Sequence, residues 1–212
     1  MTDSLVAAST PDRQQGPYDT GIITGALLWE DSKILAELLL SDHTHAQIRE
    51  TVVSNNTLLR KSKKRSLNVA SYLLQRLSSC PRPLLTMIAY ADSISSRQAS
   101  FVAALISSNF LRDFMNEVVC ERLESFDHRL PPHFWNDFWA SCRSKESTLH
   151  SLREKGVAEI RSTLLKFLAE IGILESVRAR ELHQISLSSQ VAALINTPEL
   201  AWTRAYIRCF VR

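Results

Sequence analysis

The sequence contains one dense run of cationic side chains, RKSKKR, at residues 60–65. Lysine and arginine bind phosphate oxygens through charge-assisted hydrogen bonds, and each phosphate that they neutralise releases condensed counterions. Hydroxyl and amide side chains in and after the run can reach phosphates or base edges. The pattern therefore indicates nucleic-acid binding, with these candidate contact residues: Arg60, Lys61, Ser62, Lys63, Lys64, Arg65, Ser66, Asn68 and Gln75.

The surrounding charge is strongly asymmetric. From Arg49 to Arg82 there are eight Lys and Arg residues and one acidic residue, Glu50. The whole chain has a formal net charge of only +3, so the remainder is net negative. A local cationic surface on a nearly neutral protein favours a polyanionic partner more specifically than a high net charge does.

The cationic run also fits two roles without nucleic acid. It is then either a solvated junction between a loop and a helix or a contact with a membrane surface. The helix dipole opposes cations at a helix N-terminus by roughly 0.3–1 kcal/mol per residue, which favours a partner over a purely solvated end. Leu67, Leu73 and Leu77 are expected in a helical core, and no lipid anchor adjoins the run, so we expect no membrane partner.

Further arginines near the C-terminus are supplementary candidates. Arg178 and Arg180 lie in a short, partly alternating segment, ILESVRARELHQISL at 173–187, which suits a β-hairpin wing. Arg204, Arg208 and Arg212 are spaced by four residues, and this spacing predicts one shared helical face.

No catalytic or metal-binding motif is visible. The sequence lacks H-E-x-x-H, P-loop, G-x-S-x-G and dinucleotide-glycine patterns, and its acidic residues form no pair beyond Asp113 and Glu117, spaced as on a helix surface. The four cysteines are far apart without a C-x-x-C pair, which fits a reducing cytoplasm. We expect a cytoplasmic non-enzyme without cofactor or metal.

The elements that carry these residues are expected to be helices. The chain has only 5 glycines and 7 prolines and shows helical spacing of its apolar residues. A first helix is expected at 25–40. A second runs from a cap at Asp42 or Thr44 to Ser54, and a third covers 57–79, with a turn at Asn55-Asn56 between them. The last two predict a helix-turn-helix whose second helix begins with the cationic run.

The rest of the chain predicts a helical core. Patterns cover 84–92, 95–126, the aromatic segment HFWNDFWASC and 157–172, followed by a small helix after Ser186 or Ser188 and a last one from Pro198. Aromatic spacing in HFWNDFWASC favours a buried face over a base-stacking platform. Residues 147–187 allow a second, winged helix-turn-helix. The expected organisation is a disordered leader at 1–17, a DNA-binding region at 18–80 and a helical core region at 81–212. No signal peptide and no apolar run of membrane-spanning length is seen.

Residues 18–77 resemble the start of the BrxA family of BREX bacteriophage-exclusion systems. The resemblance rests on the opening Tyr18, Thr20 and Gly21, a leucine-rich first helix, the asparagine turn before the basic helix, and Arg76-Leu77. NFLRDFMNEVVCERL at 109–123 and LLKFLAEIGIL at 164–174 also resemble family helices, so that the resemblance covers nearly all of 18–174.

The resemblance implies a cytoplasmic accessory component of phage defence, with a fold similar to the helical antitermination factor NusB and with double-stranded DNA as partner. Other BREX subunits are implied as further partners. The alternatives are an adaptor that joins subunits of the defence complex and an RNA-binding protein. The oligomeric state and any DNA sequence preference stay open.

Overall fold

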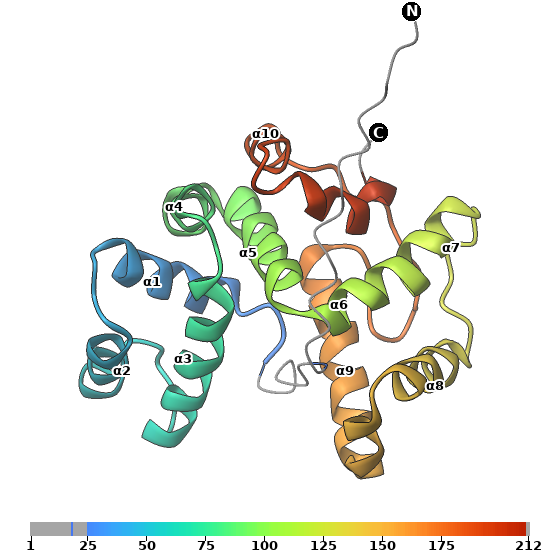
Figure 1. The fold of residues 1–212 in the computed structure, drawn as a ribbon, viewed down its shortest axis with the longest axis horizontal. Helices are drawn as coiled ribbons and strands as arrows, with labels where there is room; N and C mark the ends of the chain where they lie inside the picture. Colours follow the sequence, from blue (N-terminus) through green and yellow to red (C-terminus); the bar gives the residue numbers. More distant parts are fainter. Residues whose placement is uncertain (1–17, 19–24, 211–212) are drawn as a thin grey trace, which may run out of the picture.

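The computed structural model describes Tyr18 and residues 25–210 of the 212-residue chain (Figure 1). The expected leader at 1–17, Thr20 and Gly21 of the opening motif, and Arg212 lie outside the described residues. The described chain forms helices and irregular segments and contains no strand, only isolated β-bridges. The mainly helical class expected from the sequence is confirmed.

Four helices form one side of the molecule (Figure 1). Helix α2 begins with a capping box, in which the Thr44 side chain accepts from the backbone N–H of Gln47 and the Gln47 side chain accepts from that of Thr44. Pro81 is the N-cap of α4, and Pro83 lies in its first turn, where a proline removes no intrahelical hydrogen bond. The bounds are α1 Trp29–Leu40, α2 His45–Ser54, α3 Lys63–Ser78 and α4 Arg82–Tyr90.

Helix α5, Ser93–Ser107, lies at the centre of the fold. It contacts α1, α3 and α4 on one side and α6, α9 and α10 on the others. Its small residues, among them Ser96, Ser100 and Ala103, are buried, which lets neighbouring helices approach closely. Because α1, α3 and α4 all pack against one another or against α5, contacts cross the expected boundary after residue 80, and that division stays a prediction.

The long helix expected at 95–126 is divided into two helical segments in the structure. Ser108 has an extended backbone and its side chain accepts from the N–H of Leu111, so it ends α5 and starts a new helix. That helix continues as α6 Asn109–Phe114, the π-helix η2 Met115–Cys120 and α7 Glu121–Glu124.

The aromatic segment forms α8, Phe134–Lys145, and is followed by a 3-10 helix, η3 Ser147–Ser151, and by α9, Glu154–Ile171. Gly172 ends α9 in a left-handed conformation with φ 85°, as its position in the sequence predicted. A short α10, Ser189–Ile195, starts at the Ser188 cap.

The C-terminal segment is not the regular helix expected from the arginine spacing. It consists of two 3-10 helices, η4 Ala201–Tyr206 and η5 Arg208–Phe210, separated at Ile207. A 3-10 helix has about three residues per turn, so a spacing of four no longer places residues on one face. The predicted shared face of Arg204 and Arg208 is therefore wrong, and Arg212 lies outside the described residues.

The expected β-hairpin wing at 173–187 is not formed by strands. Within the described part of this segment, one antiparallel bridge joins Leu174 and Leu182, and a second joins Glu181 to Arg129. The N–H of Leu182 donates to His128 O at 2.6 Å and that of Leu130 donates to Arg180 O at 2.9 Å. The 173–187 segment thus forms backbone hydrogen bonds with the distant 128–130 segment. The alternating sequence pattern predicts pairing only within 173–187.

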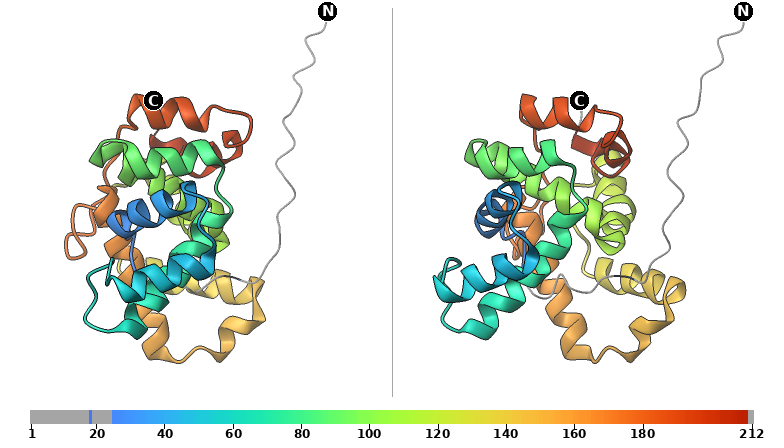
Figure 2. Two further views of the ribbon diagram at one scale, coloured as in Figure 1. Left: turned by 90° about the vertical axis from the view of Figure 1, so that its left-hand side faces the viewer. Right: turned by 60° about the vertical axis from the view of Figure 1, so that its left-hand side comes forward.

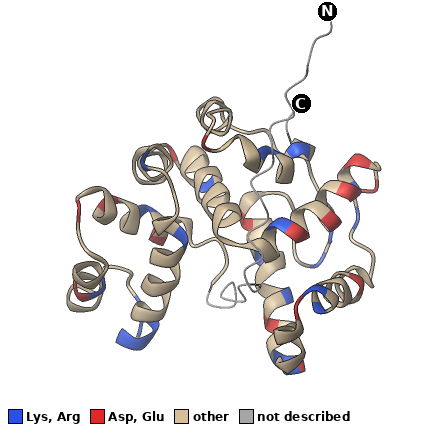
Figure 3. Ribbon diagram, viewed as in Figure 1, with Lys and Arg blue, Asp and Glu red and all other residues tan. Residues whose placement is uncertain are grey.

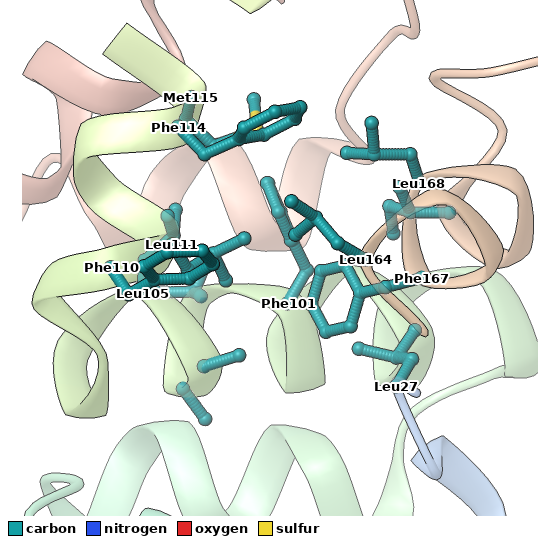
Figure 4. Packing of buried hydrophobic residues seen from close by; sticks show 14 of the residues in the cluster. Leu27, Phe101, Leu105, Phe110, Leu111, Phe114, Met115, Leu164, Phe167 and Leu168 are labelled. Carbon is teal, nitrogen blue, oxygen red and sulfur yellow. The ribbon is translucent and has the colours of Figure 1, made fainter. Parts of the chain in front are cut away.

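One apolar core joins the two sides of the molecule (Figure 4). Phe110 is fully buried, and its ring meets those of Tyr18, Trp135, Phe138 and Trp139 at centroid distances between 5.3 and 6.4 Å. The aromatic face of α8 is therefore packed into the core, as favoured over a base-stacking platform.

The described helices include none that combines the length and the apolar character needed to cross a membrane.

Candidate nucleic-acid interface

The cationic run lies at the N-terminal end of α3, at one extremity of the molecule (Figure 3). Lys61, Lys63, Lys64 and Arg65 are exposed and form no ion pair or side-chain hydrogen bond within the described part of the chain. Ser62 is the N-cap, and its side chain accepts from the N–H of Arg65 at 3.3 Å. The free N–H groups of a first helical turn and the positive dipole end also favour anions here.

Helix α3 begins six residues later than the predicted start at Thr57. Asn56 and Leu59 both have left-handed backbones, with φ 46° and 48°, and the Asn56 side chain accepts from the N–H of Arg60 at 3.1 Å. These turns occupy residues 55–62 between α2 and α3, a longer connection than the three or four residues of a typical helix-turn-helix. Arg60, Lys61 and Ser62 therefore precede the helix instead of lying within it.

Arg60 differs from its cationic neighbours. Its guanidinium forms an ion pair with Asp31 at 2.6 Å, with side-chain exposures of 29% and 12% for the two residues. Burial raises the pKa of Asp31, and the nearby Arg60 charge offsets part of that rise. The ion pair connects the loop before α3 to α1. Arg60 therefore has a structural role, and its charge is less available to a phosphate than the charges of its exposed neighbours.

Several residues of α3 outside the exposed cations have structural positions. Arg76 is 2% exposed, and its guanidinium donates to Leu27 O at 2.7 Å and to Tyr72 Oη at 2.6 Å. Ser66 is 1% exposed and cannot reach a base. Leu67, expected in the core, is exposed instead. Asn68 and Gln75 are also exposed on α3.

The C-terminal arginines lie apart from the α3 end. Helices η4 and η5 are at the top of the molecule, and the N-terminus of α3 is at the bottom (Figures 1 and 2). Arg204 is exposed, whereas Arg208 pairs with Glu124 at 2.7 Å and donates to Asn116 Oδ1 at 2.5 Å. The fold therefore does not bring these residues to one surface with the cationic run.

Arg178 and Arg180 lie in the loop after α9. The fold places both in the lining of one pocket together with Arg129, a residue that no sequence pattern singles out. The backbone pairing of 128–130 with 180–182 brings these arginines together.

The acidic pair Asp113 and Glu117 is bound internally. Lys145 forms ion pairs with both carboxylates, and Tyr18 Oη donates to Asp113 Oδ2 at 2.5 Å. Burial and the Asp113 carboxylate together raise the pKa of Tyr18. Partial burial lowers the pKa of Lys145, but its bonds to Glu117 and Asp113 outweigh this and raise it overall. Within the described residues, no group of three or more His, Cys, Asp and Glu side chains is arranged to hold a metal ion.

One exposed apolar residue in the basic region, Leu59, is not among the functional residues predicted from the sequence. Leu59 is 85% exposed and has a left-handed backbone, which is uncommon for a bulky residue. Its only sequence signal is its place directly before the cationic run.

Comparison with known proteins identifies relatives along most of the chain. The BrxA family model matches residues 16–198. The chain is 29% identical to the BREX protein BrxA of Escherichia coli O9:H4 (strain HS) over 174 residues, which is 82% of each chain. It is 25% identical to the BREX protein BrxA of Paramagnetospirillum magneticum (strain ATCC 700264 / AMB-1) over 178 residues, covering 84% of this chain and 89% of that one.

A crystal structure of an uncharacterized protein from Magnetospirillum magneticum has a similar fold, with a TM-score of 0.79, 25% sequence identity, and coverage of 92% of this chain and 98% of that one. The family match, which extends over more than half of the sequence, shows that the chain belongs to the BrxA family.

Proposed function

We propose that this protein is a non-catalytic, cytoplasmic component of a BREX phage-defence system that binds double-stranded DNA. The proposal rests on the group of exposed, unpaired cations at the N-terminal end of α3: Lys61, Lys63, Lys64 and Arg65. In this proposal α2 and α3 act as a helix-turn-helix with an extended connection, the four cations hold phosphates, and Asn68 approaches bases.

The arrangement of α9 supports a shared binding face. The N-terminal ends of α3 and α9 both lie at the bottom of the molecule (Figures 1 and 2). The charges at the start of α9 are mixed, since Glu154 and Glu159 alternate with Lys155 and Arg161. A second helix-turn-helix at 147–187 would therefore contribute less phosphate binding than α3.

An adaptor function is the second candidate, and Leu59 is the observation that favours it. An exposed leucine among cations suits a protein partner with an apolar and acidic surface better than it suits a phosphate backbone. In that case the partner is another subunit of the defence complex.

The test is fluorescence anisotropy of labelled duplex DNA, single-stranded DNA and RNA at about 50 and about 200 mM salt. Wild type is compared with Lys63→Ala/Lys64→Ala/Arg65→Ala. The matched control is Lys155→Ala/Arg161→Ala/Lys166→Ala, which removes the same charge from exposed positions of α9. We expect the α3 variant to lose duplex affinity and to reduce the slope of log K against log salt by about 0.9 for each lost phosphate contact.

Equal losses in both triple variants would mean that the α3 end is not the principal site, because net charge or the α9 face then contributes as much. Tighter binding of RNA than of duplex DNA would mean that the same surface binds RNA. If no nucleic acid binds wild type, while a BREX subunit binds it and loses affinity with Leu59→Ala, the adaptor function replaces DNA binding.

A further inference from the structure

One pocket on the described part of the chain is lined by three arginines. It has a volume of about 540 Å³ and lies between the 127–132 segment and the loop after α9. This volume is within the range of about 300–1,000 Å³ typical of small-molecule sites. Arg129, Arg178 and Arg180 share its lining with Asp127 and the apolar residues Leu130, Pro131 and Pro132.

The three guanidinium groups are not neutralised by the protein. Among the described residues, none of them forms an ion pair or a side-chain hydrogen bond. The one acid in the lining, Asp127, forms an ion pair with Arg122, and it accepts from the backbone N–H of Arg129 at 3.3 Å. Glu181 lies opposite Arg129 in the β-bridge, but it forms no ion pair with any described residue and does not line the pocket.

Backbone hydrogen bonds fix the positions of the segments that carry these arginines. The N–H of Leu130 donates to Arg180 O at 2.9 Å, and the N–H of Arg180 donates to Ser176 O at 3.1 Å. Arg180 adopts a left-handed backbone with φ 55°, a conformation that costs free energy for any residue except glycine. Two segments far apart in the sequence therefore bring three arginines to the lining of one cavity, and like charges close to one another are unfavourable without an anion.

We infer that this pocket binds the phosphate group of a small ligand, of the kind carried by a nucleotide or by the end of a nucleic-acid strand. A phosphate monoester carries about 1.5 to 2 negative charges and three acceptor oxygens, so it can bind more than one guanidinium group. A carboxylate offers one charge and two oxygens. Leu130, Pro131 and Pro132 supply an apolar wall for the remainder of the ligand. The site is separate from the α3 end and does not depend on DNA binding there.

The test is isothermal titration calorimetry at about 150 mM salt with pyrophosphate, ATP, adenosine and acetate as probes. The variants are Arg178→Ala, at an exposed position, and Arg180→Gly, which removes a cation where glycine relieves the left-handed backbone. We expect saturable binding of pyrophosphate and ATP but not of adenosine or acetate. Each variant should weaken it at least about tenfold, as expected for one lost hydrogen bond to a charged group.

Two further comparisons make the result decisive. Lys63→Ala/Lys64→Ala/Arg65→Ala should bind pyrophosphate as wild type does, even if it loses DNA. Competition with short oligonucleotides bearing a 5′-phosphate or a 5′-hydroxyl identifies the source, because displacement by only the phosphorylated one indicates a strand end. Absence of saturable phosphate binding to wild type, unchanged affinity in both arginine variants whose unfolding midpoints match wild type, or stronger binding of an acidic peptide than of pyrophosphate would overturn the inference.

Discussion

Arg60 and Lys64 are neighbours in one cationic run, yet their environments differ. Arg60 meets the buried carboxylate of Asp31, whereas Lys64 is exposed and has no ionic partner in the described structure. A residue that already satisfies a buried acid must lose that partner before it can bind a phosphate. Phosphate binding is therefore expected to depend on Lys64 and its exposed neighbours more than on Arg60.

Arg60→Ala should lower the free energy of unfolding by about 1–3 kcal/mol, because it leaves the Asp31 carboxylate without its partner. Lys64→Ala should change it by less than about 0.5 kcal/mol, since it removes an exposed and unpaired side chain. Urea unfolding measures both values. In DNA binding the order should reverse, with Lys64→Ala the weaker binder. A stable Arg60→Ala variant with lost DNA affinity would instead make Arg60 a direct contact.

Among the single elements, α9 has two glycines at its ends with opposite roles. Gly156 lies in the first turn, and a side chain added there would meet no atom within 4 Å. Gly172 ends the helix with φ 85°, a conformation that other residues rarely adopt. Only Gly172 is required by the fold. A substitution of Gly156 can therefore stabilise the helix.

Gly156→Ala should raise the free energy of unfolding by about 0.5–1 kcal/mol, because alanine loses less backbone entropy in a helix. Gly172→Ala should lower it by about 1–2 kcal/mol through left-handed strain. Thermal and urea unfolding of the two variants provide the comparison. Effects of the same sign would show that helical propensity does not control stability at these positions. If α9 is a recognition helix, a loss of DNA affinity in the stabilised Gly156→Ala variant would indicate close approach of the backbone to DNA.

In the molecule as a whole, α5 and the Phe110 aromatic group connect the two sides of the fold. Helix α5 contacts helices on both sides, and the Phe110 ring joins Tyr18 to the aromatic face of α8. The α3 end and the arginine pocket are thus carried by one continuous core. A change in that core should affect the stability of the entire protein.

Phe110→Ala should lower the free energy of unfolding by about 3–5 kcal/mol, from lost burial and the cavity that remains. The matched control is Phe126→Ala, since Phe126 is 85% exposed and should matter by less than about 0.5 kcal/mol. Urea unfolding followed by tryptophan fluorescence reports on both variants, because Trp135 and Trp139 contact Phe110. A loss below about 1 kcal/mol for Phe110→Ala, or two separate unfolding transitions in wild type, would contradict a single continuous core that depends on Phe110.

Helix caps and helix ends were largely predictable from the sequence. Thr44, Ser188 and Gly172 are found at the predicted helix ends, because capping depends on one side chain and the backbone next to it. The late start of α3 was not predictable, since the left-handed turns at Asn56 and Leu59 compete with a helical pattern that also fits these residues.

The helical class, the family resemblance and the concentrated cationic run all follow from the order of the residues. Which cations are free depends on tertiary contacts, since the Asp31 partner of Arg60 comes from α1 and the buried position of Arg76 depends on Leu27 and Tyr72. The meeting of Arg129 with Arg178 and Arg180 likewise depends on backbone bridges that replace the predicted hairpin. The physical reason is that local propensity acts over a few residues, whereas charge pairing and pocket formation require contacts between distant segments.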